Sequence, residues 1–249
     1  RRVYEQLLPD LSAAAWRAVL LCARNQSFST AAVRSALETE GIDGVAALDE
    51  AVDRGILVND GADLAFRHPL LRTAAWEIAT SEQRRRGHLA LARALSETSG
   101  SMAAVWHRAE ASTSSDPALA EELVLLAADS RARKGYAAAS AVLERAAMLS
   151  GGADEGAELL AAAASDAFVA GDVERTRTLA QRVLDESDRP ATRGTALVSL
   201  GRLELYTGSV PRAAEALTSA VSLLGGAQLI PALAGLAPAR FRLRELADL

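Results

Sequence analysis

Two side chains in the stretch FRHPLLRTAAW, residues 66–76, have the chemistry to bind an anion. Pro69 lacks a backbone N–H, which suits the first turn of a helix, and it favours an extended conformation for His68. We therefore expect His68 to be an N-cap, with its imidazole at a helix start that attracts anions. Arg72, one turn further on, is the second candidate. The alternatives are capping alone for His68 and an ion pair with Glu77 or a neighbouring acid for Arg72.

The other reactive side chains do not form a catalytic pattern. Lys134 is the only lysine and glycine follows it, so this chain has no phosphate-binding G-x-x-x-x-G-K-[ST] loop. Histidines 68, 88 and 107 have no cysteine or acidic partners at metal-ligand spacing. Cys22 falls on the apolar stripe of a helix, which predicts a buried thiol. We predict no catalytic residue and no metal site, and we do not expect this chain to be an enzyme by itself.

Three helices and a hairpin are expected before His68. Apolar residues recur with helical spacing over residues 11–24, 30–40 and 44–55, with Ser12 and Ser29 as caps. Two short apolar runs then flank Asn59-Asp60-Gly61, which is typical of a tight hairpin turn. This order of elements predicts a winged-helix domain over residues 1–79 that ends in the HPLLR helix.

Everything from Ser81 onward is expected to be helical, with Ser81 as the first cap. Gly135, Gly171 and Gly208 lie 36 and 37 residues apart, and each precedes an amphipathic helix. Alignment on these glycines brings together three sets of small or apolar residues: Ser140, Thr176 and Ala213; Ala147, Val183 and Ala220; Val124, Leu160 and Leu197. Such a period indicates tetratricopeptide-like helical hairpins. The predicted fold class is mainly α, with an α-solenoid over residues 80–249 that is truncated at its C-terminal end.

Composition favours a helical protein of the cytoplasm. Half of the 249 residues are apolar and only 4% are aromatic, and alanine, the most frequent apolar type, suits close helix packing. A single cysteine excludes an internal disulfide and is typical of a reducing compartment. The chain contains no run of about 18 apolar residues, the length that predicts a membrane span, so no membrane partner is expected. The first residue is not Met and the last residues continue a helical pattern, which suggests a piece of a longer protein.

The charge of the expected winged helix argues against DNA binding. Residues 1–79 contain 8 arginines, no lysine and 11 acidic residues, a net charge of −3. The third helix, which would enter a major groove, carries three acids and one base and would repel the phosphate backbone. We therefore expect this domain to contact protein. Arg84, Arg85 and Arg86 are expected to form a solvated face beside Glu82 rather than a nucleic-acid patch.

The segment FRHPLLRTAAW, together with the following SEQRRRGHLALARAL, resembles the LuxR-type large ATP-binding regulators of the STAND class of signal-transducing ATPases. In that family the pattern F-R-H-P-L-L-R, a short helix and E-R-R-x-x-H-x-x-L-A-x-A-L connect a winged helix to helical repeats. The pattern is carried here by Phe66, Arg67, His68, Pro69, Leu70, Leu71, Arg72, Arg84, Arg85, His88, Leu91, Ala92 and Leu95. AVWHRAE, residues 104–110, and residues 128–149 also match, so the resemblance covers nearly the whole chain.

The resemblance implies a larger protein with ATP or ADP as its cofactor. An upstream nucleotide-binding domain would carry the P-loop, the winged helix would pack on it, and the repeats would bind an effector or partner. A C-terminal helix-turn-helix would bind the promoter DNA. In the STAND class a Met-His-Asp motif often follows the wing, and its histidine approaches the β-phosphate of ADP. His68 occupies the matching place, between Arg67 and Pro69, so the resemblance implies an ADP-sensing role for His68, and for Arg72 as the second candidate, in the full-length protein; no cofactor is expected in this fragment.

Two alternatives stay open beside this hypothesis of a winged helix that relays nucleotide state. The first is a free-standing tetratricopeptide-like adaptor without a nucleotide link. The second is an antibiotic-regulatory type activator whose own winged helix binds DNA, against which the acidic third helix argues.

Overall fold

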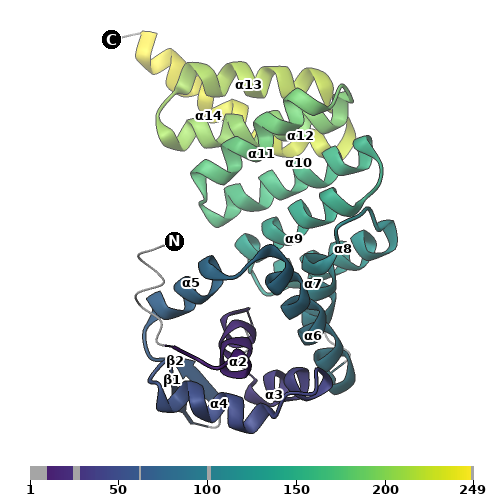
Figure 1. Cartoon of the computed structure of the whole chain (residues 1–249). Coiled ribbons are helices and arrows are strands. Elements are labelled where there is room, and N and C mark those ends of the chain that lie inside the picture. Colours follow the sequence, from purple (N-terminus) through teal and green to yellow (C-terminus); the bar gives the residue numbers. More distant parts are fainter. Residues whose placement is uncertain (1–9, 25–28, 62, 100–101, 248–249) are drawn as a thin grey trace. The chain divides into compact units, whose positions relative to one another are not determined.

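The computed structural model describes residues 10–24, 29–61, 63–99 and 102–247, and these residues are mainly helical, as predicted (Figure 1). Contacts divide the chain into two compact units, residues 1–113 and residues 114–249. The boundary predicted at residue 79 falls within the first unit, and it stays a prediction. In the part of the chain that the structure describes, no helix has the length and apolar content needed to cross a membrane.

In the described part of the first unit, three capped helices come first: α2 (Ala13–Arg24), α3 (Thr30–Thr39) and α4 (Gly44–Asp53). Both predicted caps are present, since Ser12 Oγ accepts from Ala15 N–H at 3.1 Å and Ser29 Oγ accepts from Ala32 N–H at 3.3 Å. The carboxylate of Asp43 caps α4 in the same way. These bonds satisfy N–H groups that a helix start leaves without internal partners.

The expected hairpin follows, formed by β1 (Leu57–Asp60) and β2 (Asp63–Phe66) in an antiparallel pair. Asn59 and Asp60 lie within β1 rather than in the turn, and Gly61, whose φ of +66° suits glycine, follows β1. The hairpin is fastened to α3, because Asp63 accepts from Thr30 N–H at 2.8 Å and the Thr30 hydroxyl accepts from Leu64 N–H at 3.0 Å.

Helices α5 (Pro69–Ile78), α6 (Ser81–Ser99) and α7 (Met102–Ala111) complete the first unit. The predicted cap of α6 was wrong by one residue. Thr80, not Ser81, is the cap: Thr80 Oγ1 accepts from Gln83 N–H at 3.2 Å, while Gln83 Oε1 accepts from Thr80 N–H at 2.8 Å. This reciprocal pair is a capping box, which satisfies two N–H groups together and therefore takes precedence over a lone serine hydroxyl.

The core of the first unit surrounds α2, which packs against α3, α4, α5 and α6 (Figure 1). Its fully buried members are small or branched, among them Val19, Leu21, Val33, Leu37 and Leu91. Cys22 is buried within the same core, as predicted, and burial raises the pKa of its thiol to about 12. This thiol is therefore a protonated packing group in water of ordinary pH.

The second unit is a row of helices, each packed on the one before. They are α8 (Pro117–Ala132), α9 (Tyr136–Leu149), α10 (Ala153–Ala170), α11 (Val173–Glu186), α12 (Pro190–Thr207), α13 (Val210–Leu223), the short 3₁₀ helix η1 (Gly226–Gln228) and α14 (Leu229–Ala247). Helix α10 also contacts α12, and α12 contacts α14, so alternate helices lie side by side (Figure 1).

The internal period is more regular than the glycines indicated. Helices α9, α11 and α13 begin at residues 136, 173 and 210, so both intervals are 37 residues. The residue in left-handed conformation between the paired helices is Lys134 (φ +60°), Gly171 (φ +79°) or Gly208 (φ +111°), again at intervals of 37. Gly135 has a φ of −83° and occupies the N-cap position of α9.

Alignment on Gly135 therefore placed the first hairpin one residue out of register. The position matching Leu160 is Leu123, which is fully buried, whereas Val124 is 37% exposed. In the same way Ala139 and Ala146, rather than Ser140 and Ala147, match the buried positions of α11 and α13. The reason is that a lysine supplies the left-handed residue in this hairpin, so glycine does not mark the turn there.

Close contacts in the second unit depend on helical glycines. A Cβ at Gly201 of α12 would lie 2.5 Å from Leu217 Cγ of α13, and a Cβ at Gly194 would lie 2.6 Å from Leu224. Both leucines are buried. The absent side chains let these helices approach each other more closely than any L-residue would allow.

Candidate functional site

His68 is the N-cap of α5, as predicted. Its backbone is extended (φ −142°, ψ 134°), Pro69 follows at the first helical position, and its Nδ1 accepts from Leu70 N–H at 3.2 Å. The side chain is exposed. The imidazole therefore performs the capping that the sequence indicated, and its role toward a nucleotide stays a prediction.

Arg72 points back onto α2. Its Nε donates to the backbone carbonyl of Ala23 at 3.1 Å, near the C-terminal end of α2 where carbonyl groups lack helical partners. Arg72 also lines two shallow hollows of about 360 and 420 Å³, and Pro69 lines both of them, whereas His68 is not among the described residues that line either. The structure thus places the two predicted site residues on one helix without joining them in one hollow.

Trp76, further along α5, is the centre of a cluster of cations. The guanidinium carbon of Arg24 lies 4.3 Å from the centre of the indole, and that of Arg84 lies 5.1 Å from it. His88 meets the same indole edge to face, with ring centres 5.6 Å apart. An indole face attracts cations through its negative quadrupole, so it holds two like charges near each other.

The pKa of Arg24 reflects its burial and the positive charges around it. Burial lowers the pKa of its guanidinium, and the nearby charges of Arg72 and Arg84 lower this pKa further, while Glu110 opposes them. The Arg24–Glu110 ion pair spans 3.5 Å and joins α2 to α7. Arg84, in addition, has an Nε that is buried and has no hydrogen-bond partner among the described residues, although its NH2 group donates to Glu77 O at 3.3 Å.

Beneath these cations two histidines pair across α6 and α7. His88 Nδ1 and His107 Nδ1 lie 2.8 Å apart, and the two side chains are only 3% and 4% exposed. One Nδ1 must donate and the other accept, so one of these two nitrogens is protonated and the other is not. Burial, and to a smaller degree the charge of Arg24, lower the pKa of His107 to about 4.

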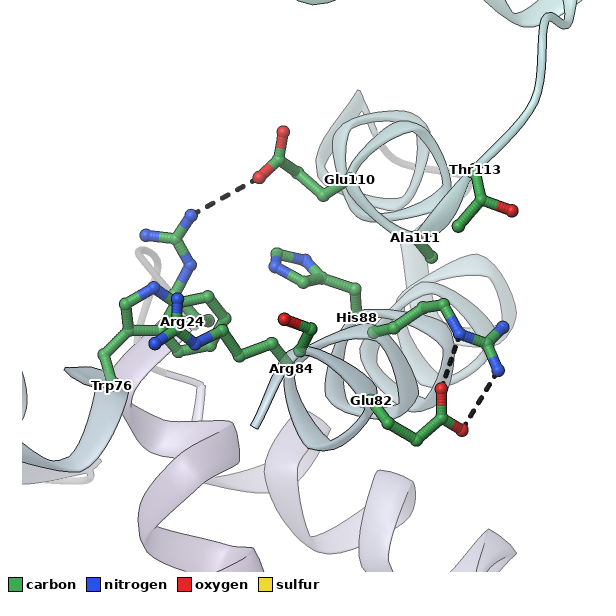
Figure 2. A pocket seen from close by; sticks show the side chains of 10 residues that line it. Arg24, Trp76, Glu82, Arg84, His88, Glu110, Ala111 and Thr113 are labelled. Atoms are coloured by element: carbon green, nitrogen blue, oxygen red, sulfur yellow. Dashed lines mark hydrogen bonds and ion pairs between the residues drawn. The ribbon is translucent and has the colours of Figure 1, made fainter. Parts of the chain in front are cut away.

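Several of these side chains, though not His107, line one hollow of about 630 Å³, which we call the Trp76 pocket (Figure 2). Its principal residues are Arg24 from α2, Trp76 from α5, Arg84 and His88 from α6, Glu110 from α7, and Thr113. Figure 2 shows Arg24, Arg84 and Trp76 together on one side, the imidazole of His88 pointing toward them, and Glu110 opposite Arg24.

Sequence reasoning missed this pocket. Arg84 was expected in solvent, and His88 and His107 were considered as metal ligands and as parts of the LuxR-type pattern, without a partner for either. Among the described residues no group of three or more His, Cys, Asp or Glu side chains could hold a metal ion. A usable signal was present nonetheless: His88 and His107 fall on the buried sides of consecutive helices, and a buried histidine requires a polar partner.

Comparison of the chain with protein families, with curated proteins and with solved structures finds no match.

Proposed function

We propose that this chain is a regulatory and interaction module, in which a winged-helix domain is followed by tetratricopeptide-like helical hairpins. Within that class, we propose that it belongs to a STAND-type regulator of the LuxR family. The winged helix would relay the nucleotide state of a separate ATPase domain, and the repeat surface would bind an effector or partner. Nucleotide chemistry would then belong to that ATPase domain and promoter binding to a helix-turn-helix elsewhere in the protein.

The observation that carries this proposal is the His68-Pro69 junction. Among the described residues, three helices and a two-stranded hairpin precede it, and a helix capped by His68 begins shortly after β2. The FRHPLLR pattern of LuxR-type regulators has the same order of elements. Support for the repeat assignment comes from the 37-residue interval between the starts of α9, α11 and α13.

The chemistry of α4 supports a protein-contacting winged helix over a DNA-binding one. Of its three acids, Glu50 accepts from both the backbone N–H and the hydroxyl of Ser12, at 2.8 and 2.6 Å, and these bonds keep its carboxylate ionised by lowering its pKa. A helix that carries fixed negative charge disfavours a phosphate backbone. An electrophoretic mobility shift of DNA by this fragment, weakened by added salt, would favour the DNA-binding alternative.

The first test is the gene sequence upstream of Arg1. A P-loop is expected within about 300 residues, the length of roughly two domains. Absence of that motif would leave the free-standing adaptor as the better reading of this chain.

The second test separates capping from nucleotide sensing at His68 in the full-length protein. Asn is a good N-cap but lacks an imidazole, whereas Ala lacks both functions. Loss of one contact to a phosphate weakens ADP binding by about 10-fold, so we expect both His68→Asn and His68→Ala to release ADP faster and to raise basal transcription. Unchanged ADP affinity in both variants would leave His68 with the capping role alone.

A further inference from the structure

The Trp76 pocket contains more cationic donors than its carboxylates can accept. Arg24 and Arg84 line it directly, and Arg72 is close enough to lower the pKa of Arg24. The carboxylate of Glu82, at the rim, is already bound by Arg85 at 2.9 Å and Arg86 at 2.7 Å, and these bonds, Arg85 first, lower its pKa to about 2. The carboxylate of Glu82 is therefore already paired with Arg85 and Arg86, and among the described residues it forms no ion pair with Arg24 or Arg84.

Glu110 is the remaining carboxylate that lines the pocket. It faces Arg24 at 3.5 Å, a long separation for a charge-assisted hydrogen bond, which is typically about 2.7–2.9 Å. For Arg84 the structure provides two weak contacts in place of an acid: the indole of Trp76 and the carbonyl of Glu77 at 3.3 Å. Its buried Nε is without a hydrogen-bond partner in the described part of the chain. Such a donor lowers the stability of the protein unless an acceptor reaches it.

We propose that the Trp76 pocket binds the oxyanion group, phosphate or carboxylate, of a small molecule between the guanidinium groups of Arg24 and Arg84. Both groups present planar arrays of N–H donors that match such oxyanions. The hydroxyl of Thr113 lines the same hollow and is a neutral donor for a further oxygen. A volume of about 630 Å³ is in the range of small-molecule sites, so the ligand has room for a body beyond its anionic group.

This site is separate from the proposed nucleotide contact. His68 is not among the described residues that line the Trp76 pocket, and oxyanion binding there requires neither His68 nor a nucleotide-binding domain. The inference thus holds or fails independently of the proposed function.

The test measures binding of inorganic phosphate and, in a parallel arm, succinate, by isothermal titration calorimetry on the 249-residue chain at constant ionic strength. We expect saturable binding of one of them, which identifies the oxyanion class. Arg84→Gln should weaken it by about 10-fold or more, the effect of losing a charge-assisted contact. Arg86→Gln is the matched control, since Arg86 lies on the same helix, is exposed and is not among the described residues that line the pocket.

Glu110→Gln provides a second, opposite readout that does not depend on how well Arg84→Gln folds. Removing this carboxylate frees Arg24 and takes away repulsion of the incoming anion, so affinity should rise by about 3-fold to 10-fold. Three results would overturn the proposal: no saturable binding of either anion, equal binding by Arg84→Gln and Arg86→Gln, or unchanged affinity in Glu110→Gln.

Discussion

The buried pair of His88 and His107 makes the first unit sensitive to acid. A second proton on this pair would set two N–H groups against each other across 2.8 Å, in a site from which water is largely excluded. The charges nearest to it do not favour that proton, because Arg24 from α2 lowers the pKa of His107. Glu110 from α7 is bound to Arg24, and Arg84 from α6 adds further positive charge nearby.

The size of the effect follows from the folded pKa. The pKa of His107 is about 4 in the folded protein and 6.5 as the ordinary value. Between these two values the unfolded chain binds more protons than the folded one, so stability decreases as the pH falls. Lowering the pH from 7.5 to 4.5 should lower the free energy of unfolding by about 2.5 kcal/mol through this one group.

Tryptophan fluorescence isolates the relevant unit, because all three tryptophans, at positions 16, 76 and 106, lie in residues 1–113. Urea unfolding followed by this signal at pH 7.5, 6.5, 5.5 and 4.5 gives the free energy of unfolding at each pH. Other groups also titrate in this range, so the quantity to compare is the loss of stability in the wild type minus that in His107→Gln.

We expect His107→Gln to remove about 2.5 kcal/mol of the pH dependence. His68→Gln is the matched control, since His68 belongs to the same unit and its substitution leaves the His88–His107 pair intact, so the loss of stability that depends on His107 should remain. If the wild type and the His107→Gln variant lose the same free energy of unfolding between pH 7.5 and 4.5, to within about 0.5 kcal/mol, the acid sensitivity does not come from His107.

Two further substitutions test packing and backbone conformation in the second unit. Gly201→Ala places a Cβ 2.5 Å from Leu217 and should destabilise the unit by about 1–2 kcal/mol, even though alanine has the better helix propensity. The control is Gly225→Ala, whose added Cβ would have no atom within 4 Å and which should be nearly neutral. Thermal unfolding followed by circular dichroism measures both effects. Lys134→Gly should stabilise the unit by about 1 kcal/mol, because Lys134 has a φ of +60°, which glycine adopts more readily. Arg133→Gly is the control and should not stabilise the unit, because φ is −90° at Arg133. Equal effects of the two glycines on the melting temperature would contradict this account of the turn.

Local signals were predictable from the sequence, and contacts between distant segments were not. Ser12, Ser29 and His68 act within a few residues, so their capping roles follow from the chain itself. The hairpin and the helical class were predictable for the same reason. The Trp76 pocket draws side chains from α2, α5, α6 and α7, and the pattern of any one helix does not show which arginine faces an indole on another.

The errors have equally physical causes. Ser81 was predicted as the cap, although Thr80, with Gln83 three residues on, has the spacing of a capping box and Ser81 has Arg84 at that distance. The first hairpin was placed out of register because glycine is a statistical marker of left-handed backbone, and Lys134 adopts that conformation instead. Conformation, rather than residue type, is what recurs every 37 residues.

Lys134 has one more consequence. It is exposed at the turn between α8 and α9, and no other residue of the chain has a side-chain primary amine. Reagents that acylate amines therefore have a single side-chain target here, and so do enzymes that attach acetyl groups or ubiquitin to lysine. A dye or a surface coupled through this side chain would be attached at one known turn of the helical hairpins, while every arginine keeps its charge.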